Sequence, residues 1–433
     1  MISRVVTCLN AKRVAVVLVL LAVLAVGYVA SADEDSPARA SGDAQLGGAP
    51  SACGPAVLEA LSQVTQRVYD EGVSSERTEI AMRLVKGSRA LREAVERDDA
   101  GAARTAAQAL LANGHLTNLT VLSGGRTLAS VGSEGALAPL HGSILNATGA
   151  PIASFVTSVW ADRGFLSELK GVVEGDVALR EGSHSLGGSF AMPPGELPPA
   201  GTLTEHGTVF QYDSFPASSY PSGSLRVYLL RTADSTARIC GSTPQDTLVN
   251  TLSRVAALIY AGEGGPHALT QVRRAQQDSA LLAAVAERNP AAVRRAVVGL
   301  VYGHTHIVRL RVSAGGRLLA DVGGPYVLAP VQAPLRLHGK QVGELTLSIQ
   351  DDEGYLRLAR RLVGLDVLMY MNPTTHPELV KNSLGPGVGG FSSVPASGTY
   401  HYRGRTFRVF TLDARSFPSG PLRVLVLIPI PYS

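Results

Sequence analysis

Three consecutive acidic residues, Asp351, Asp352 and Glu353, are the side chains of this sequence best placed to do chemistry. They stand where a predicted strand, residues 343–350, gives way to a predicted helix. Carboxylates at such a junction accept hydrogen bonds from the first helical turn, which stabilises a helix by roughly 0.3 to 1 kcal/mol. They can equally hold a cationic or hydroxyl-bearing ligand, and the sequence leaves both roles open. Asp162 takes the place of Asp352 in a second, similar segment.

Aromatic and basic side chains farther along the chain could complete a binding cavity with this carboxylate. Burial beside aromatic rings disfavours the charge of an aspartate unless a cation or hydrogen-bond donors compensate it, so a ligand amine is the natural complement. The tyrosines could instead pack a core, and alternate residues of a strand face opposite sides of a sheet. The predicted ligand-binding residues are Asp352, Tyr355, Tyr370, Tyr400, Tyr402 and Arg408.

Two cysteines, Cys53 and Cys240, are predicted to form a disulfide. Neither lies in a CxxC motif or a zinc-ligand spacing, and each is followed by a glycine just before a predicted helix. Two such helices packed side by side in parallel would bring both cysteines together. A disulfide forms and persists in an oxidising compartment, so the pairing agrees with export from the cytoplasm.

Motifs of known catalytic chemistry are absent from the sequence, which has no HExxH, GxSxG or P-loop. His304 and His306 have the residue type of metal ligands, but no nearby cluster of carboxylates or cysteines completes a site. We therefore expect no catalytic residue, no metal and no cofactor, and we predict that the protein is not an enzyme.

The composition indicates a large globular protein. The chain has 433 residues, of which 45% are hydrophobic, and it carries 39 Lys and Arg against 35 Asp and Glu. This length exceeds one ordinary domain of roughly 100 to 200 residues, which predicts two domains. Because the basic residues are scattered rather than clustered, we expect no nucleic-acid partner.

The N-terminus predicts export. Residues 14–29 form an uncharged apolar run with basic residues before it and acidic residues after it. This asymmetry keeps the N-terminus inside and places the remainder outside the cytoplasm. Residues 1–32 are either a signal anchor or a cleaved signal peptide, and residues 33–50 are a predicted flexible linker. The expected location is the cell membrane, with one membrane pass and extracytoplasmic domains, or secretion if the signal is cleaved.

An internal repeat organises the rest of the chain. Residues 88–132 align without a gap to residues 279–323, and residues 201–230 align in the same way to residues 398–427. Matches of this length and density indicate a duplication of a domain-sized unit.

Each copy predicts an α+β fold. Apolar residues three or four apart predict a long leading helix, and Gly124-Gly125 and Gly315-Gly316 separate alternating segments as hairpin turns do. The predicted order is helices, two strands, a loop, a strand, a helix and three strands. We expect a single antiparallel sheet with helices mainly on one face. The predicted domains are residues 51–235, the first copy, and residues 236–433, the second copy.

The leading helix, the Gly-Gly-Arg hairpin and the segment GELTLSIQDDEGYLRLARRL at 343–362 together resemble Cache domains. These are extracytoplasmic relatives of PAS sensor domains, and the resemblance covers most of residues 51–433 in two tandem copies. It implies binding of a small ligand between a sheet and its overlying loops. We expect a sensory module without an output domain of its own, acting through a membrane or signalling partner. A structural or accessory cell-envelope protein without a ligand is the alternative.

Overall fold

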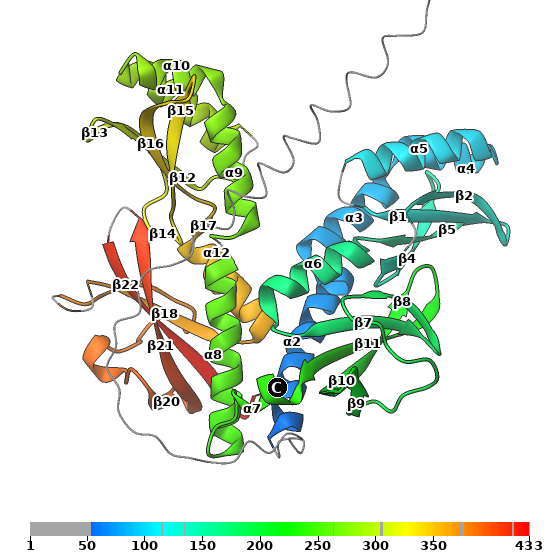
Figure 1. Ribbon diagram of the computed structural model, residues 1–433. Helices are drawn as coiled ribbons and strands as arrows, with labels where there is room; N and C mark the ends of the chain where they lie inside the picture. The colour runs from blue at the N-terminus through cyan, green and yellow to red at the C-terminus, as the bar shows by residue number, and fades with distance from the viewer. Residues whose placement is uncertain are drawn as a thin grey trace, which may run out of the picture. The chain divides into compact units, whose positions relative to one another are not determined.

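The computed structural model describes residues 53–432, except 114–115, 134, 263, 304–305, 373, 375 and 418–419. The predicted signal segment and linker lie outside the described residues. Within the described residues, no helix is both long enough and apolar enough to cross a membrane. The fold is α+β, and its helices and antiparallel sheets recur in two successive halves (Figure 1).

The first copy opens with a helical region. In the leading helix, Val57, Leu61, Val64 and Val68 recur every three or four residues and are at most 3% exposed, as an amphipathic helix requires. Each of the three helices that follow begins at a side chain that accepts a hydrogen bond from its first turn. The helices are α2 (Gly54–Ser74), α3 (Glu76–Gly87), α4 (Arg89–Glu96) and α5 (Ala100–Ala112).

Two antiparallel sheets follow in the first copy. The smaller has the order β2-β1-β5-β4, and the larger has the order β6-β3-β10-β11-β7-β8, with β9 paired to β10. Helix α6 (Asp162–Val172) joins β6 to β7. The strands are β1 (Asn118–Ser123), β2 (Arg126–Gly132), β3 (Ala136–Leu137), β4 (Leu140–Leu145), β5 (Pro151–Ser158), β6 (Trp160–Ala161), β7 (Asp176–Glu181), β8 (His184–Gly188), β9 (Gly201–Glu205), β10 (Thr208–Ser219) and β11 (Gly223–Thr232).

The second copy repeats this order after the short helix α7 (Ala233–Ala237). Its sheets have the orders β13-β12-β16-β15 and β17-β14-β21-β22-β18-β19, with β20 paired to β21. The helices are α8 (Pro244–Gly262), α9 (Pro266–Gln277), α10 (Ser279–Ala286), α11 (Pro290–Tyr302) and α12 (Asp352–Leu358), which continues as η1 (Ala359–Val363); η2 is Phe391–Ser393. The strands are β12 (Arg309–Ala314), β13 (Arg317–Gly323), β14 (Val327–Leu328), β15 (Val331–Leu337), β16 (Lys340–Ser348), β17 (Gln350–Asp351), β18 (Asp366–Met371), β19 (Glu378–Asn382), β20 (Gly398–Tyr402), β21 (Arg405–Phe417) and β22 (Gly420–Ile430).

The expectation of a single sheet in each copy is wrong. The chain passes from the smaller sheet into the larger one after β2 and after β5, and in the second copy after β13 and after β16, each time through a strand of two residues. In each copy, one serine side chain forms a hydrogen bond across the junction between the two sheets. Ser158 Oγ donates to Leu137 O at 2.5 Å, and Ser348 Oγ donates to Leu328 O in the same way. The shared contact fixes the junction between the two sheets at equivalent positions.

The gapless alignment of residues 88–132 with residues 279–323 is also wrong over the helices. Ser88 and Asp278 cap equivalent helices, and Asp99 and Asn289 cap the next pair. The connection into β1 spans 113–117, whereas the one into β12 spans 303–308, which is one residue longer. The strands that follow keep the predicted correspondence, because the bulge at Val121 recurs at Val312.

The hydrophobic core has separate parts. The smaller sheet of each copy packs with its own helices, α3 to α5 or α9 to α11. One face of each larger sheet packs with α2, α6, α8 and α12 in a core that both copies share. The opposite faces carry smaller clusters covered by loops. Alternate residues along β7 and β18 therefore belong to different clusters.

Candidate functional site

A cavity of about 710 Å³ lies in the first copy, at the start of α6. Its walls come from β3, β6, β7, β8 and the turn between β10 and β11. Several polar side chains line it: Asp162 and Glu181 supply carboxylates, Arg163 supplies a guanidinium, and hydroxyl groups come from Ser133, Ser219 and Tyr220. A concave site with a few convergent polar groups is the usual form of a small-ligand site.

Backbone contacts position Asp162 at this cavity. Its N–H donates to Gly135 O at 2.6 Å, which joins the start of α6 to β3. Its Oδ1 accepts from the N–H of Arg163 at 2.6 Å, as a carboxylate in the first helical turn does. A Cβ atom at Gly135 would lie only 2.5 Å from Oδ2, and the φ of Gly135 is +74°. The positive φ favours glycine there, and a Cβ atom would displace the carboxylate of Asp162.

Tyr220 closes the cavity between the two sheets of the first copy. Its hydroxyl donates to Thr120 Oγ1 at 2.6 Å and also lies 3.2 Å from Val156 O, so the tyrosine links the β10–β11 turn to the smaller sheet. Burial raises the pKa of Tyr220 despite the hydrogen bond to Thr120. Next to it, Ser219 and Glu181 approach Gly223 so closely that a Cβ there would clash with both side chains.

The second copy has larger side chains where the first has two glycines. Tyr326 stands at the position of Gly135, because the N–H of Asp352 donates to Tyr326 O as that of Asp162 does to Gly135 O. Lys381 stands at the position of Gly187, since it lies opposite Met369 of β18 as Gly187 lies opposite Leu179, the equivalent residue of β7. Both positions therefore carry a long side chain in the second copy and none in the first.

Lys381 neutralises the acidic junction of the second copy. Its Nζ lies 2.7 Å from Glu353 Oε1 and 4.0 Å from Asp352 Oδ2. The hydrogen bond and the charge of Glu353 raise the pKa of Lys381, and the same contact lowers the pKa of Glu353. Burial raises the pKa of Asp352. The neighbouring Asp351 is the helix cap, since its Oδ1 accepts from the N–H of Gly354 at 2.6 Å.

The structure does not bring the six predicted binding residues together around one cavity. Tyr370 of β18 lies in the cluster on the loop-covered face of the sheet. Tyr355 of α12 lies on the other side, in the shared core. Their hydroxyls are used internally, with Tyr370 donating to Gly389 O at 3.2 Å and Tyr355 donating to Ala256 O at 3.1 Å.

The remaining predicted residues also pack within the second copy. Tyr402 donates to Pro386 O at 2.7 Å, and the ring of Tyr400 stacks on the ring of Tyr402 with 6.3 Å between centroids. Arg408 pairs with Asp246 of α8 at 3.1 Å. Packing of the tyrosines, the alternative role, is therefore what the structure shows, and the long loop after Met371 covers a core cluster.

The pH dependence of stability provides a test of the packing of Tyr370. Burial raises the pKa of Tyr370 to about 12. Because the folded pKa lies above the ordinary value, the stabilisation is present below about pH 10 and is lost as the pH rises toward 12. Denaturant titrations of Tyr370→Phe should lack roughly 2 to 3 kcal/mol of this alkaline loss. Tyr302→Phe, at a side chain that is 71% exposed, is the control. An identical pH profile for Tyr370→Phe and wild type would contradict the assignment.

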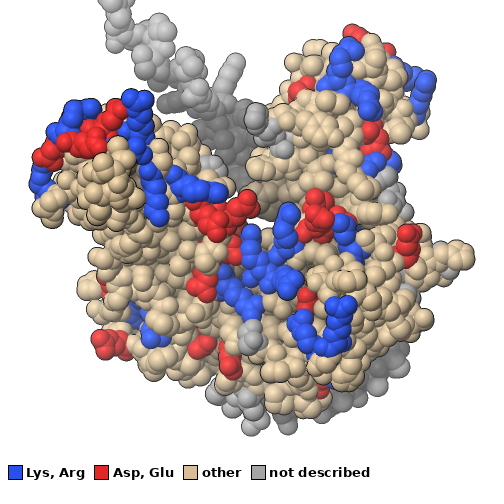
Figure 2. Space-filling model, turned by 180° about the vertical axis from the view of Figure 1, so that it is seen from behind, with Lys and Arg blue, Asp and Glu red and all other residues tan. Residues whose placement is uncertain are grey.

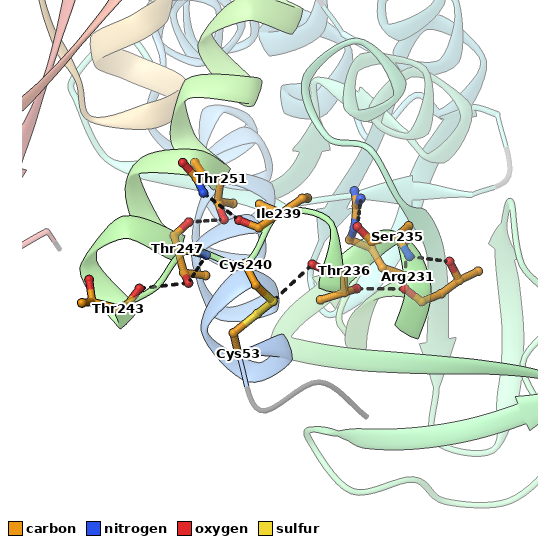
Figure 3. The surroundings of a disulfide bond; sticks show 12 residues. Cys53, Arg231, Ser235, Thr236, Ile239, Cys240, Thr243, Thr247 and Thr251 are labelled. Atoms are coloured by element: carbon orange, nitrogen blue, oxygen red, sulfur yellow. Dashed lines mark hydrogen bonds between the residues drawn. A yellow bond between two sulfur atoms is a disulfide. The ribbon is translucent and has the colours of Figure 1, made fainter. Parts of the chain in front are cut away.

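The structure joins Cys53 and Cys240, the pair that the sequence predicts, in a disulfide with 5.9 Å between the Cα atoms. Figure 3 shows the bond between the start of α2 and the segment that connects α7 to α8. Helix α8 holds this segment, because Asn250 donates to Ile239 O at 3.1 Å and Thr247 Oγ1 accepts from the N–H of Gly241 at 2.9 Å. The leading helices of the two copies also share one hydrophobic core.

Charges of both signs occur on the surface. Figure 2 shows Lys and Arg gathered near the middle of one face, with Asp and Glu beside them. Within the described part of the chain, no group of three or more His, Cys, Asp or Glu side chains could hold a metal ion. His304 lies outside the described residues, and His306 is exposed.

Comparison with known proteins finds only distant similarity, to solved structures. No protein-family model and no curated protein matches the chain. A solved structure described as an extracellular ligand binding receptor from Desulfohalobium retbaense DSM5692 matches at 11% sequence identity and a TM-score of 0.23. The match covers 54% of this chain and 47% of the receptor, which is less than half of the receptor's length. A similarity at this level does not establish a shared fold or function.

Proposed function

We propose that the protein is an extracytoplasmic sensory module that binds a small, amine-bearing ligand in the cavity of the first copy. The observation that carries the proposal is the 710 Å³ cavity at the start of α6, bordered by the carboxylates of Asp162 and Glu181. A cavity of this size suits a small metabolite. The resemblance of the sequence to Cache domains agrees with such a role, and a Cache-like fold is part of the proposal.

The charge of the cavity supports a cationic group on the ligand. Two carboxylates face a single guanidinium, that of Arg163, so the described wall has an excess of negative charge. The second copy supplies an ammonium group of its own, from Lys381, beside the aspartate equivalent to Asp162. The first copy has Gly187 at that position, which leaves room for an ammonium group from outside.

The disulfide supports an extracytoplasmic location. A bond between Cys53 and Cys240 persists in an oxidising space such as a periplasm or the outer surface of a cell. The apolar run at residues 14–29 agrees with export by a signal peptide or anchor. The proposal includes a membrane or signalling partner protein that reads the ligand-bound state.

The substitution Gly187→Lys tests the site. This variant places a lysine where the second copy has Lys381. The new ammonium group should pair with Asp162 and occupy the cavity. Gly187→Ala is the matched control, because a Cβ atom at Gly187 would lie 3.8 Å from Asp162 Oδ2, an ordinary contact. Thermal-shift screening of the full chain against small amines, with neutral and anionic compounds for comparison, identifies a ligand. Gly187→Lys should then bind at least about tenfold more weakly, a loss of ~1.4 kcal/mol, and Gly187→Ala should bind as wild type.

Two results would count against the proposal. Unchanged affinity in Gly187→Lys would place the ligand elsewhere in the molecule. If no amine or other small metabolite raises the melting temperature, the protein is better described as a structural or accessory component of the cell envelope.

A further inference from the structure

The carboxyl group of Asp352 is buried with half of its hydrogen-bonding capacity unused. The residue is only 8% exposed. Its Oδ1 accepts from the N–H of Glu353 at 3.0 Å, but Oδ2 has no hydrogen-bond partner among the described residues. A buried carboxylate oxygen without a donor is costly, because burial removes its water and supplies nothing in return. Such an atom indicates a place where a cation or donor is expected.

The nearest positive charge is the ammonium of Lys381. Its Nζ lies 4.0 Å from Oδ2 of Asp352, beyond hydrogen-bond distance, and 2.7 Å from Glu353 Oε1. The lysine extends from β19 over the start of α12, and its side chain is 33% exposed. The ammonium thus occupies an acidic site that solvent can reach, and the four-carbon stem of the side chain is the link that carries it there.

The repeat shows that this lysine is not needed to build the fold. The first copy forms the same strand pair and the same helix start with Gly187 at that position. Its aspartate, Asp162, makes the same two backbone contacts as Asp352. At this junction the copies differ in the residue after the aspartate, Arg163 in the first and Glu353 in the second, and in the residue of the neighbouring strand, Gly187 in the first and Lys381 in the second.

We infer that Lys381 is a covalently attached occupant of a second ammonium site, formed by Asp352 and Glu353, and that this latent site binds a short primary alkylamine when the lysine is shortened. The inference rests on the proposed function, because both place an ammonium group beside the aspartate at the start of the helix. The second copy is then permanently in its occupied state, and only the first copy responds to ligand.

Chemical rescue of Lys381→Gly tests the inference. n-Butylamine reproduces the four carbons and the ammonium that this substitution removes. The full chain should also carry Asp162→Asn, so that amine binding in the first copy does not contribute. We expect Lys381→Gly to lower the melting temperature by roughly 1 to 4 °C in this background. n-Butylamine should restore at least half of the loss, with a saturable concentration dependence.

Three controls separate a site from a general effect of the amine. 1-Butanol, the uncharged equivalent, should give no rescue. Asp352→Asn added to Lys381→Gly should weaken n-butylamine binding at least about tenfold. Asp162→Asn with Lys381 intact should show no saturable rise. If glycine in β19 prevents folding, Lys381→Ala with n-propylamine provides the same measurement.

The outcomes are distinct from those of the proposed function. Absence of saturable rescue, or an equal rise when Lys381 is intact, would overturn the latent site while leaving ligand binding in the first copy in place. Rescue in the second copy together with no amine binding by the wild-type chain would support the latent site and overturn the ligand proposed for the first copy.

Discussion

Replacing Cys53 and Cys240 together by serine is expected to lower the free energy of unfolding by roughly 4 to 5 kcal/mol. The disulfide joins residues 187 positions apart, so it removes much of the freedom that the unfolded chain would otherwise have. In the chain-entropy description, the stabilisation grows with the length of the closed loop. Denaturant unfolding of the double variant and of wild type measures the difference.

The single variants serve as the control for this prediction. Cys53→Ser and Cys240→Ser each abolish the same covalent bond, so each should cost nearly as much as the double variant, and the effects should not add. Labelling of the non-reduced wild type at either thiol, or a wild-type stability that reductant leaves unchanged, would show that the bond does not contribute.

The substitution Tyr355→Ala is expected to destabilise the fold by roughly 3 to 5 kcal/mol, the usual range for loss of a buried aromatic ring. Tyr355 of α12 is 0% exposed and packs toward α8, where its ring and that of Tyr260 form an edge-to-face contact with 6.1 Å between centroids. The surrounding core joins both copies, so little of the space left by the ring can be filled by local movement. Thermal or denaturant unfolding measures the loss.

Tyr355→Phe separates the ring from its hydroxyl. This change removes the hydroxyl that donates to Ala256 O and should cost about 0.5 to 1.5 kcal/mol. The first copy already has a phenylalanine, Phe165, at the equivalent position, where it is 0% exposed. Phe165→Ala should therefore cost about as much as Tyr355→Ala. A large loss of ligand binding in Tyr355→Phe, with stability unchanged, would instead support the role in binding that the sequence suggests for this tyrosine.

The parts of the fold that depend on local pattern were predictable. Apolar spacing predicts α2 and α8, and paired glycines predict the hairpins that begin each smaller sheet. The division into two sheets was not predictable, because alternation shows which face of a strand is buried but not which strand lies beside it. The crossing also depends on strands of two residues, β3 and β6, which are too short to produce a pattern. The matching serines Ser158 and Ser348 were the available signal.

The candidate site was harder to predict than the fold. Sequence reasoning favoured the second copy because tyrosines accumulate there, yet Tyr370 and Tyr402 donate to backbone carbonyls within a loop-covered cluster. Gly135 lines the cavity of the first copy, at the position where the second copy has Tyr326. In the sequence of one copy alone, such a glycine cannot be told from a glycine in an ordinary turn. Comparing Gly135 with Tyr326 in the aligned copies was the signal that could have located the cavity.

The bond between residues 53 and 240 makes the first copy a covalent ring. A protease that cuts once in any loop of this ring opens it but releases no fragment, because both cut ends remain attached through the sulfur atoms. The nicked protein would migrate as one molecule in a denaturing gel and would separate into two pieces only after reduction. In the proposed extracytoplasmic location, such a closed ring would allow one break in the backbone by a protease without loss of either part.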